Sequence, residues 1–188
     1  MPRDGKTNRS GSAAILEPGE LQELFAELDD PYRAIVQVCY LTAGRIGEVL
    51  ALRVDHIKNG YVVFPAPNTK TGETRKVTLT EPLQKAIDRV RPSSGYLFPS
   101  TALAGHLTAR AVEKHVKAAA ELMGFEGVSL HSFRRSRLTH LHEQGWGLHE
   151  LKRVSSHKSL QQLQQYLGVD QAVVDEKLKQ ADVGFEVV

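Results

Sequence analysis

The hydrophobic positions in the first quarter of the chain follow a helical period. From Leu21 to Leu28, apolar residues recur at intervals of three and four, which predicts a helix that Pro31 ends. The next segment is apolar nearly all round and predicts a central core helix, which breaks at Thr42-Ala43-Gly44. A third helix is predicted directly after the break, over residues 45–52.

Between residues 54 and 79 the pattern changes to alternation. Three short runs have alternating hydrophobic and polar positions, at 54–58, 61–64 and 74–79. Asn59-Gly60 separates the first two runs, and Asn-Gly between apolar runs is a strong signal for a β-hairpin. The region therefore predicts a small antiparallel sheet with one strand for each run.

Helical spacing returns after Pro82 and continues through most of the remaining chain. After this helix, the predicted helices cover residues 108–123, 132–144, 148–154, 159–167 and 171–180, and the longest loop covers 92–105. Ser159 and Gln162 form a capping-box pattern at the start of one helix. The expected fold class is α+β, mostly α: a helical domain with a small three-stranded antiparallel sheet.

The chain length fits one domain. At 188 residues it can bury a core, but it is short for two domains of ordinary size. Residues 1–14 are rich in Gly, Ser, Lys and Arg, so we expect a flexible basic arm or interdomain linker there. The domain is expected over 15–182, and residues 183–188 form a C-terminal tail.

Composition excludes some classes of protein. The lone cysteine, Cys39, has no partner for a disulfide, and the most apolar segment is far shorter than a membrane span, so we expect a cytoplasmic protein without membrane contact. The net charge of +2 and the pI near 8.7 permit a nucleic-acid partner without demanding one. Basic residues gather at 134–137 and 152–153, which is either a solvated helix face or a phosphate-binding surface.

Motifs for metal, nucleotide and acyl-transfer chemistry are incomplete. Gly5-Lys6-Thr7 lacks the upstream glycine of a P-loop, and the chain has no Gly-x-Ser-x-Gly. His142-Glu143 and His149-Glu150 lack the second histidine of a zinc-protease helix. Eight histidines without partnering cysteines favour surface and structural roles over a metal site. We expect no metal and no cofactor.

Cleaving a phosphodiester without metal or ATP needs a nucleophile, positive charge at the non-bridging oxygens and a proton for the leaving oxygen. Arginine suits the second task because its planar fork binds two oxygens and is always charged. Helix N-termini add donors for the same phosphate. Arg45 follows the break at Gly44, and Arg134 follows Leu130-His131, so both are predicted in the first turn of a helix.

Several candidate residues follow one another in a set order along the chain: Arg45 and Glu48, Lys70 between two predicted strands, His131 and Arg134 in His-x-x-Arg, and His157 nine positions before Tyr166. This order resembles one family, the tyrosine recombinases or phage integrases. The segment 42–52 resembles the family's first box, with Arg45 and, one turn later, Glu48. Each motif alone is common, and the specific feature is their order over residues 15–180.

The resemblance implies a role for each residue. Tyr166 would attack the scissile phosphate and form a 3′-phosphotyrosyl link, so that rejoining needs no cofactor. Arg45 and Arg134 would neutralise the transition state, and His157 would donate a further hydrogen bond.

The other three matched residues would assist these groups. Lys70 would be the general acid for the 5′ oxygen, and His131 would take the tyrosine proton or hold the phosphate. Glu48 would fix the geometry of an arginine or a histidine.

Plainer interpretations exist for the same residues. Tyr166 could pack as an ordinary amphipathic-helix residue, Arg45 and Glu48 could be an i, i+3 surface pair, and Lys70 could be a solvated turn lysine. The histidines without a role are expected to be structural or on the surface: His106, His115, His140, His142 and His149.

The implied partner is double-stranded DNA, in site-specific recombination of a mobile element. Relatives carry an N-terminal helical domain that clamps DNA, which has no room in this chain. The chain is therefore expected to be either a catalytic fragment of a longer protein, the favoured alternative, or a minimal stand-alone version. The segment 171–180 resembles the helix that relatives exchange between protomers, which implies a homotetramer on paired sites and a monomer for the fragment. The direction of recombination is expected to depend on accessory proteins. Ser156 departs from the family, which commonly has glycine there.

Two other functions fit the same residues. A type IB topoisomerase shares the fold, the nucleophile and both arginines, although those enzymes tend to carry lysine where this chain has His131. A catalytically silent DNA-binding module would keep the fold and lose cleavage.

Overall fold

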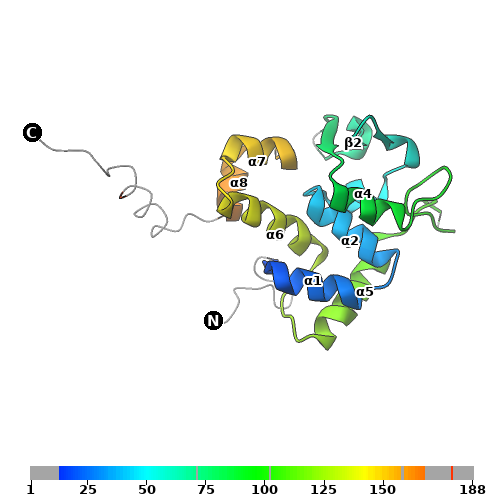
Figure 1. The fold of residues 1–188 in the computed structure, drawn as a ribbon, viewed down its shortest axis with the longest axis horizontal. Helices are drawn as coiled ribbons and strands as arrows, with labels where there is room; N and C mark the ends of the chain where they lie inside the picture. Colours follow the sequence, from blue (N-terminus) through cyan, green and yellow to red (C-terminus); the bar gives the residue numbers. More distant parts are fainter. Residues whose placement is uncertain (1–12, 71, 102, 158, 168–178, 180–188) are drawn as a thin grey trace, which may run out of the picture.

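The computed structural model describes residues 13–70, 72–101, 103–157, 159–167 and 179. Figure 1 shows the arrangement of the elements. The helices are α1 (Pro18–Glu27), α2 (Tyr32–Leu41), α3 (Ile46–Leu50), α4 (Glu81–Asp88), α5 (Ala109–Leu122), α6 (Leu130–Glu143), α7 (Leu148–Ser155) and α8 (Leu160–Leu167). The strands are β1 (Ile57–Lys58), β2 (Tyr61–Phe64) and β3 (Arg75–Thr78), with short 3-10 helices at Val54–His56 and Ala66–Asn68.

The sheet is antiparallel in the order β1-β2-β3. Asn59 and Gly60 form the first turn with φ of 53° and 75°, the left-handed conformation that Asn-Gly adopts in tight hairpins. In the second pair, Phe64 lies opposite Arg75. Both side chains are buried, so an arginine occupies an inward position of this strand.

Two hydrophobic clusters hold the helices together. The larger one surrounds α2, which contacts α1, α3, α4, α5 and α6. The smaller one joins α6, α7 and α8 through Leu138, Leu141, Leu151 and Leu163, and it includes Ala43 from the loop after α2. In Figure 1, α7 and α8 lie beside α6, and the sheet lies above α2 and α4. The loop after α2 therefore meets both halves of the domain.

The fold class is confirmed as mostly α with a three-stranded antiparallel sheet. Two local predictions are wrong. Residues 54–56 form a 3-10 turn instead of a strand, because the Val54 amide donates to the Gly95 carbonyl of a distant loop (3.0 Å). Helix α6 begins at Leu130, after the N-cap Ser129, so Arg134 lies in the second turn. The predicted arm, the helix over 171–180 and the tail fall almost wholly outside the described residues.

Candidate active site

The loop between α2 and α3 carries Arg45 and is tightly built. Thr42 is buried and its hydroxyl donates to the Val38 carbonyl (2.6 Å), and Ala43 has a positive φ of 47°. A Cβ on Gly44 would lie 2.8 Å from the Thr42 hydroxyl and 2.9 Å from a Val49 methyl. The loop accepts only glycine there without rearrangement, and it delivers Arg45 to the N-cap of α3.

Glu48 lies one turn later and binds Arg45. Its Oε1 accepts from Arg45 Nη1 (2.7 Å) and its Oε2 from the Arg45 amide (3.2 Å). The carboxylate is 3% exposed, and the Arg45 side chain is 25% exposed, so Arg45 projects from a buried anion towards solvent. Burial raises the pKa of Glu48, but hydrogen bonds from Arg45 and the charges of Arg75 and Arg45 outweigh it, and the pKa is lowered overall.

Arg75 is the second cation on Glu48, and the sequence analysis did not select it. Its Nη2 lies 3.4 Å from Glu48 Oε2, and its Nη1 donates to the carbonyls of Thr42 (2.7 Å) and Val154 (2.8 Å). The guanidinium stacks 4.1 Å from the centre of the Phe64 ring. Burial lowers its pKa to about 10, opposed by Glu48, so it stays charged at neutral pH. The sequence feature that could have indicated this buried arginine is the pairing of Arg75 with the inward-facing Phe64 across the hairpin.

Arg134 lies beside this network and is 1% exposed. Its Nη1 donates to the Ala43 carbonyl (2.5 Å), and its Nη2 donates to the Ser155 carbonyl (2.8 Å) and lies 3.3 Å from His157 Nε2. The guanidinium thus links α6 to the loop that carries Arg45 and to the end of α7.

His157 is oriented by Ser155. Its Nδ1 lies 2.7 Å from the Ser155 hydroxyl, which donates to the Leu151 carbonyl (2.7 Å). The hydroxyl therefore accepts from Nδ1–H, which leaves Nε2 as an acceptor towards Arg134. Burial, then the charges of Arg134, Arg45 and His131, lower the pKa of His157 to about 4, so the ring is neutral at pH 7.

Ser156 forms the turn between α7 and His157. It has φ 52° and ψ 45°, the left-handed conformation, at the C-cap of α7. Glycine adopts this conformation with less strain, so the serine keeps the turn that a glycine would make.

The other sequence-predicted residues lie around this cluster or are only partly described. His131 is exposed in the first turn of α6 and lines a hollow of about 330 Å³ with Arg45. Lys70 is exposed in the turn between β2 and β3, and no contact joins it to the cluster among the described residues. Tyr166 lies in α8, but its side chain is outside the described part of the chain.

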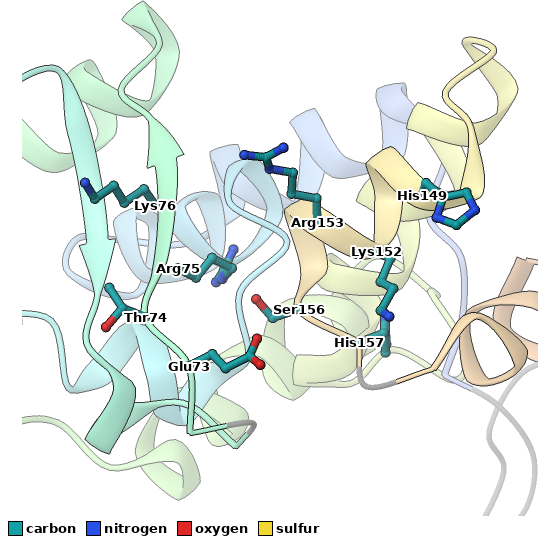
Figure 2. A pocket seen from close by; sticks show the side chains of 9 residues that line it. All are labelled: Glu73, Thr74, Arg75, Lys76, His149, Lys152, Arg153, Ser156 and His157. Atoms are coloured by element: carbon teal, nitrogen blue, oxygen red, sulfur yellow. The ribbon is translucent and has the colours of Figure 1, made fainter.

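A larger cavity of about 690 Å³ separates β3 from α7 beside His157 (Figure 2). Its cations lie on both walls, with Lys76 on the strand side and Lys152 and Arg153 on the helix side. These three side chains make no ion pair with any residue that the structure describes. The residues that line it are Glu73, Thr74, Arg75, Lys76, His149, Lys152, Arg153, Ser156 and His157.

The comparison with known protein families decides the identity. A model described as the phage integrase family matches residues 14–172. The chain belongs to the phage integrase family. This integrase-family chain is 30% identical over 148 residues to the integrase of Escherichia phage P2, which covers 78% of this chain and 40% of that protein. It is 28% identical over 166 residues to tyrosine recombinase XerC of Corynebacterium efficiens, which covers 83% of this chain and 53% of that protein.

Solved structures share the fold of the integrase-family chain. XerA recombinase matches 92% of this chain and 66% of its own, with a TM-score of 0.72 and 19% identity. The Tn1549 transposon integrase in complex with a circular intermediate DNA matches 93% of this chain and 68% of its own, with a TM-score of 0.75 and 15% identity. The integrase-family chain thus spans about half the length, or less, of the two curated relatives named above.

Within the described ranges, no cluster of His, Cys, Asp and Glu could hold a metal ion. Among the same residues, no helix is both long and apolar enough to cross a membrane.

Proposed function

We propose that this chain is the catalytic part of a site-specific tyrosine recombinase, which cleaves and rejoins double-stranded DNA through a 3′-phosphotyrosyl intermediate without metal or ATP. The observation that carries the proposal is the convergence of Arg45, Arg134 and His157 from three separate elements. Burial, and then the charges of Arg134 and Arg45, lower the pKa of His157. A residue whose pKa is perturbed both by burial and by a specific charged neighbour is a candidate functional-site residue.

A DNA phosphate fits the space that these residues face. Arg45 keeps a partly exposed side chain beside a hollow that also includes His131. Lys76, Lys152 and Arg153 extend the positive surface from His157 across the neighbouring cavity, where they would contact further backbone phosphates. Named relatives are an integrase and a recombinase, and the solved Tn1549 integrase is in complex with DNA, which supports this partner.

Residues of this chain would supply the nucleophile, the positive charge and both proton transfers of the reaction. Tyr166 Oη attacks the scissile phosphorus, a P–O bond forms to the tyrosine, and the bond to the 5′ oxygen breaks. Arg45 and Arg134 neutralise the charge on the non-bridging oxygens. His131 takes the tyrosine proton, and Lys70 gives a proton to the 5′ oxygen. Rejoining reverses these steps with a 5′ hydroxyl from another strand.

His157 is prepared for a hydrogen-bonding role. Ser155 fixes the orientation of its ring through Nδ1, so Nε2 faces Arg134 and the site. A phosphate bound there brings negative charge that favours a proton on the ring. His157 would then donate from Nε2 to a non-bridging oxygen, while Arg134 turns a donor to the phosphate.

A suicide-substrate assay tests the proposal. The natural protein that contains this chain is incubated in EDTA with nicked duplexes of candidate sites, and covalent protein–DNA adduct is measured on a denaturing gel. We expect adduct from the wild type and none from Tyr166→Phe. DNA binding without adduct would indicate a silent DNA-binding module instead.

A second readout separates recombination from relaxation. Paired sites on one supercoiled plasmid should give recombinant products in the same conditions. Relaxed plasmid without any recombinant would indicate topoisomerase chemistry. Assembly as a tetramer on paired sites stays a prediction, which cross-linking on the same DNA measures.

A further inference from the structure

We infer that Arg75 is a positioning residue for the cleavage reaction: it shares the charge of Glu48 with Arg45 and thereby leaves Arg45 able to neutralise the scissile phosphate. This inference rests on the proposed function. Arg75 itself lies 3% exposed behind Glu48, so it acts through its neighbours instead of touching DNA at that phosphate.

The first step is the shared carboxylate. Glu48 is 3% exposed and its two oxygens divide between the cations: Oε1 binds Arg45 Nη1 at 2.7 Å, and Oε2 faces Arg75 Nη2 at 3.4 Å. A buried carboxylate needs compensating positive charge. With Arg75 present, two guanidinium groups supply it. Without Arg75, Arg45 alone compensates the negative charge of Glu48. The positive electrostatic potential that Arg45 presents to an incoming anion is then lower.

The second step is the position of the segments. Arg75 Nη1 joins the Thr42 carbonyl to the Val154 carbonyl. Thr42 lies in the loop that presents Arg45, and Val154 lies in the last turn of α7, just before His157. One side chain from β3 therefore holds together the two segments that carry these site residues.

Lysine cannot reproduce this arrangement. Arg75 meets two carbonyls and one carboxylate with a planar group stacked 4.1 Å from the centre of the Phe64 ring. The ammonium of a lysine is a compact point charge without the fork geometry or the flat stacking face. Arg75→Lys therefore keeps a positive charge but loses the geometry.

The test compares two DNA substrates for each variant. One carries the natural scissile phosphodiester and the other a methylphosphonate at that position, which lacks the negative charge of the phosphodiester. Adduct formation is measured at saturating DNA for wild type, Arg75→Lys, Arg45→Ala and Lys85→Gln. Lys85 is the control because it is exposed on α4 and paired with Glu81 (2.6 Å).

We expect Arg75→Lys to slow cleavage of the natural substrate by about 10²-fold, the usual effect of a small misplacement of a reacting group. Its apparent DNA affinity should change little. On the methylphosphonate, the ratio of the wild-type cleavage rate to the Arg75→Lys rate should be at least tenfold smaller than on the natural substrate. The same should hold for Arg45→Ala. Lys85→Gln should match wild type on both substrates.

Three outcomes would overturn the inference. An equal loss of cleavage rate on both substrates means that Arg75 supports the fold without positioning Arg45. An unchanged cleavage rate on the natural substrate means that Arg75 supports neither the fold nor Arg45. If Arg75→Lys is unfolded at the assay temperature, both substrates are compared at a lower temperature at which it is folded, and an equal loss on both there also overturns the inference. No adduct from wild type on either substrate overturns the proposed function itself.

Discussion

Arg75 and Arg134 bind consecutive carbonyl oxygens on the same two segments. Arg75 takes the first carbonyl of each pair and Arg134 the second, the pairs being 42–43 and 154–155. The two guanidinium groups come from β3 and α6, which are far apart in the sequence. Together they join the loop that carries one proposed catalytic arginine to the end of the helix before the proposed catalytic histidine.

Loss of Arg75 should destabilise the domain strongly. Arg75→Met leaves two carbonyls without their donor and removes one of the two cations on Glu48, so we expect the free energy of unfolding to fall by about 3–5 kcal/mol. Urea unfolding measures it. The matched control is Lys76→Met, one residue on and exposed, which should stay within about 0.5 kcal/mol of wild type. A loss below about 1 kcal/mol for Arg75→Met would contradict the role described here.

Two glycines of the same segment should respond in opposite directions. A Cβ at Gly44 meets Thr42 and Val49 at under 3 Å, so Gly44→Ala should lower the free energy of unfolding by about 1–3 kcal/mol. Gly47 has open space around its Cα and lies in α3, so Gly47→Ala should raise it by up to about 1 kcal/mol. Thermal unfolding of both variants checks the pair. Equal changes in stability for the two variants would mean that the loop around Gly44 rearranges to accept a Cβ at little cost.

The sequence patterns that predicted the structure correctly are local ones. Asn59-Gly60 between alternating runs predicts the first hairpin, because the turn geometry depends on those two residues alone. The leucine spacing from Leu21 predicts α1, and the break at Gly44 predicts the loop of Arg45. These features need no knowledge of distant partners, so the sequence alone is sufficient.

The features that could not be predicted from the sequence depend on residues that are distant along the chain. Arg75 looks like any basic residue of a hairpin until Glu48 and Val154 are known to lie beside it. The turn at 54–56 depends on a hydrogen bond to Gly95. Arg134 lies a turn later in α6 than predicted, because Ser129 caps the helix. Burial of a charge is a tertiary property, which hydrophobic spacing along the chain does not reveal.

Ser156→Gly should stabilise the domain. The left-handed conformation of Ser156 strains a residue that has a Cβ, and glycine removes that strain, so we expect a gain of about 1 kcal/mol in the free energy of unfolding. The control is Ser94→Gly in an exposed loop, where φ is not positive and glycine should give no gain. Chemical denaturation measures both variants. A loss of stability in Ser156→Gly would show that the serine side chain matters more than the backbone strain.

Stability should fall as the pH drops through the range in which only the unfolded chain protonates His157. Its pKa in the folded chain is about 4 and that of an unfolded histidine is about 6.5. Between these values the unfolded state binds more protons, so acid favours unfolding. His157→Gln should show a shallower loss of stability from pH 6.5 to pH 4 in urea titrations. Identical pH profiles would mean that the ring accepts its proton in the folded state.

The basic walls of the cavity between β3 and α7 should set the salt dependence of DNA binding. Lys76 and Arg153 line it from opposite sides and make no ion pair within the described residues, so each is available for a backbone phosphate. Lys76→Gln and Arg153→Gln should each reduce the slope of log binding constant against log salt by about 0.9, measured by fluorescence anisotropy over a salt series. Lys85→Gln, which removes an ion-paired lysine on α4, should leave the slope unchanged. Slopes that stay at the wild-type value in both cavity variants would place the DNA backbone elsewhere on the domain.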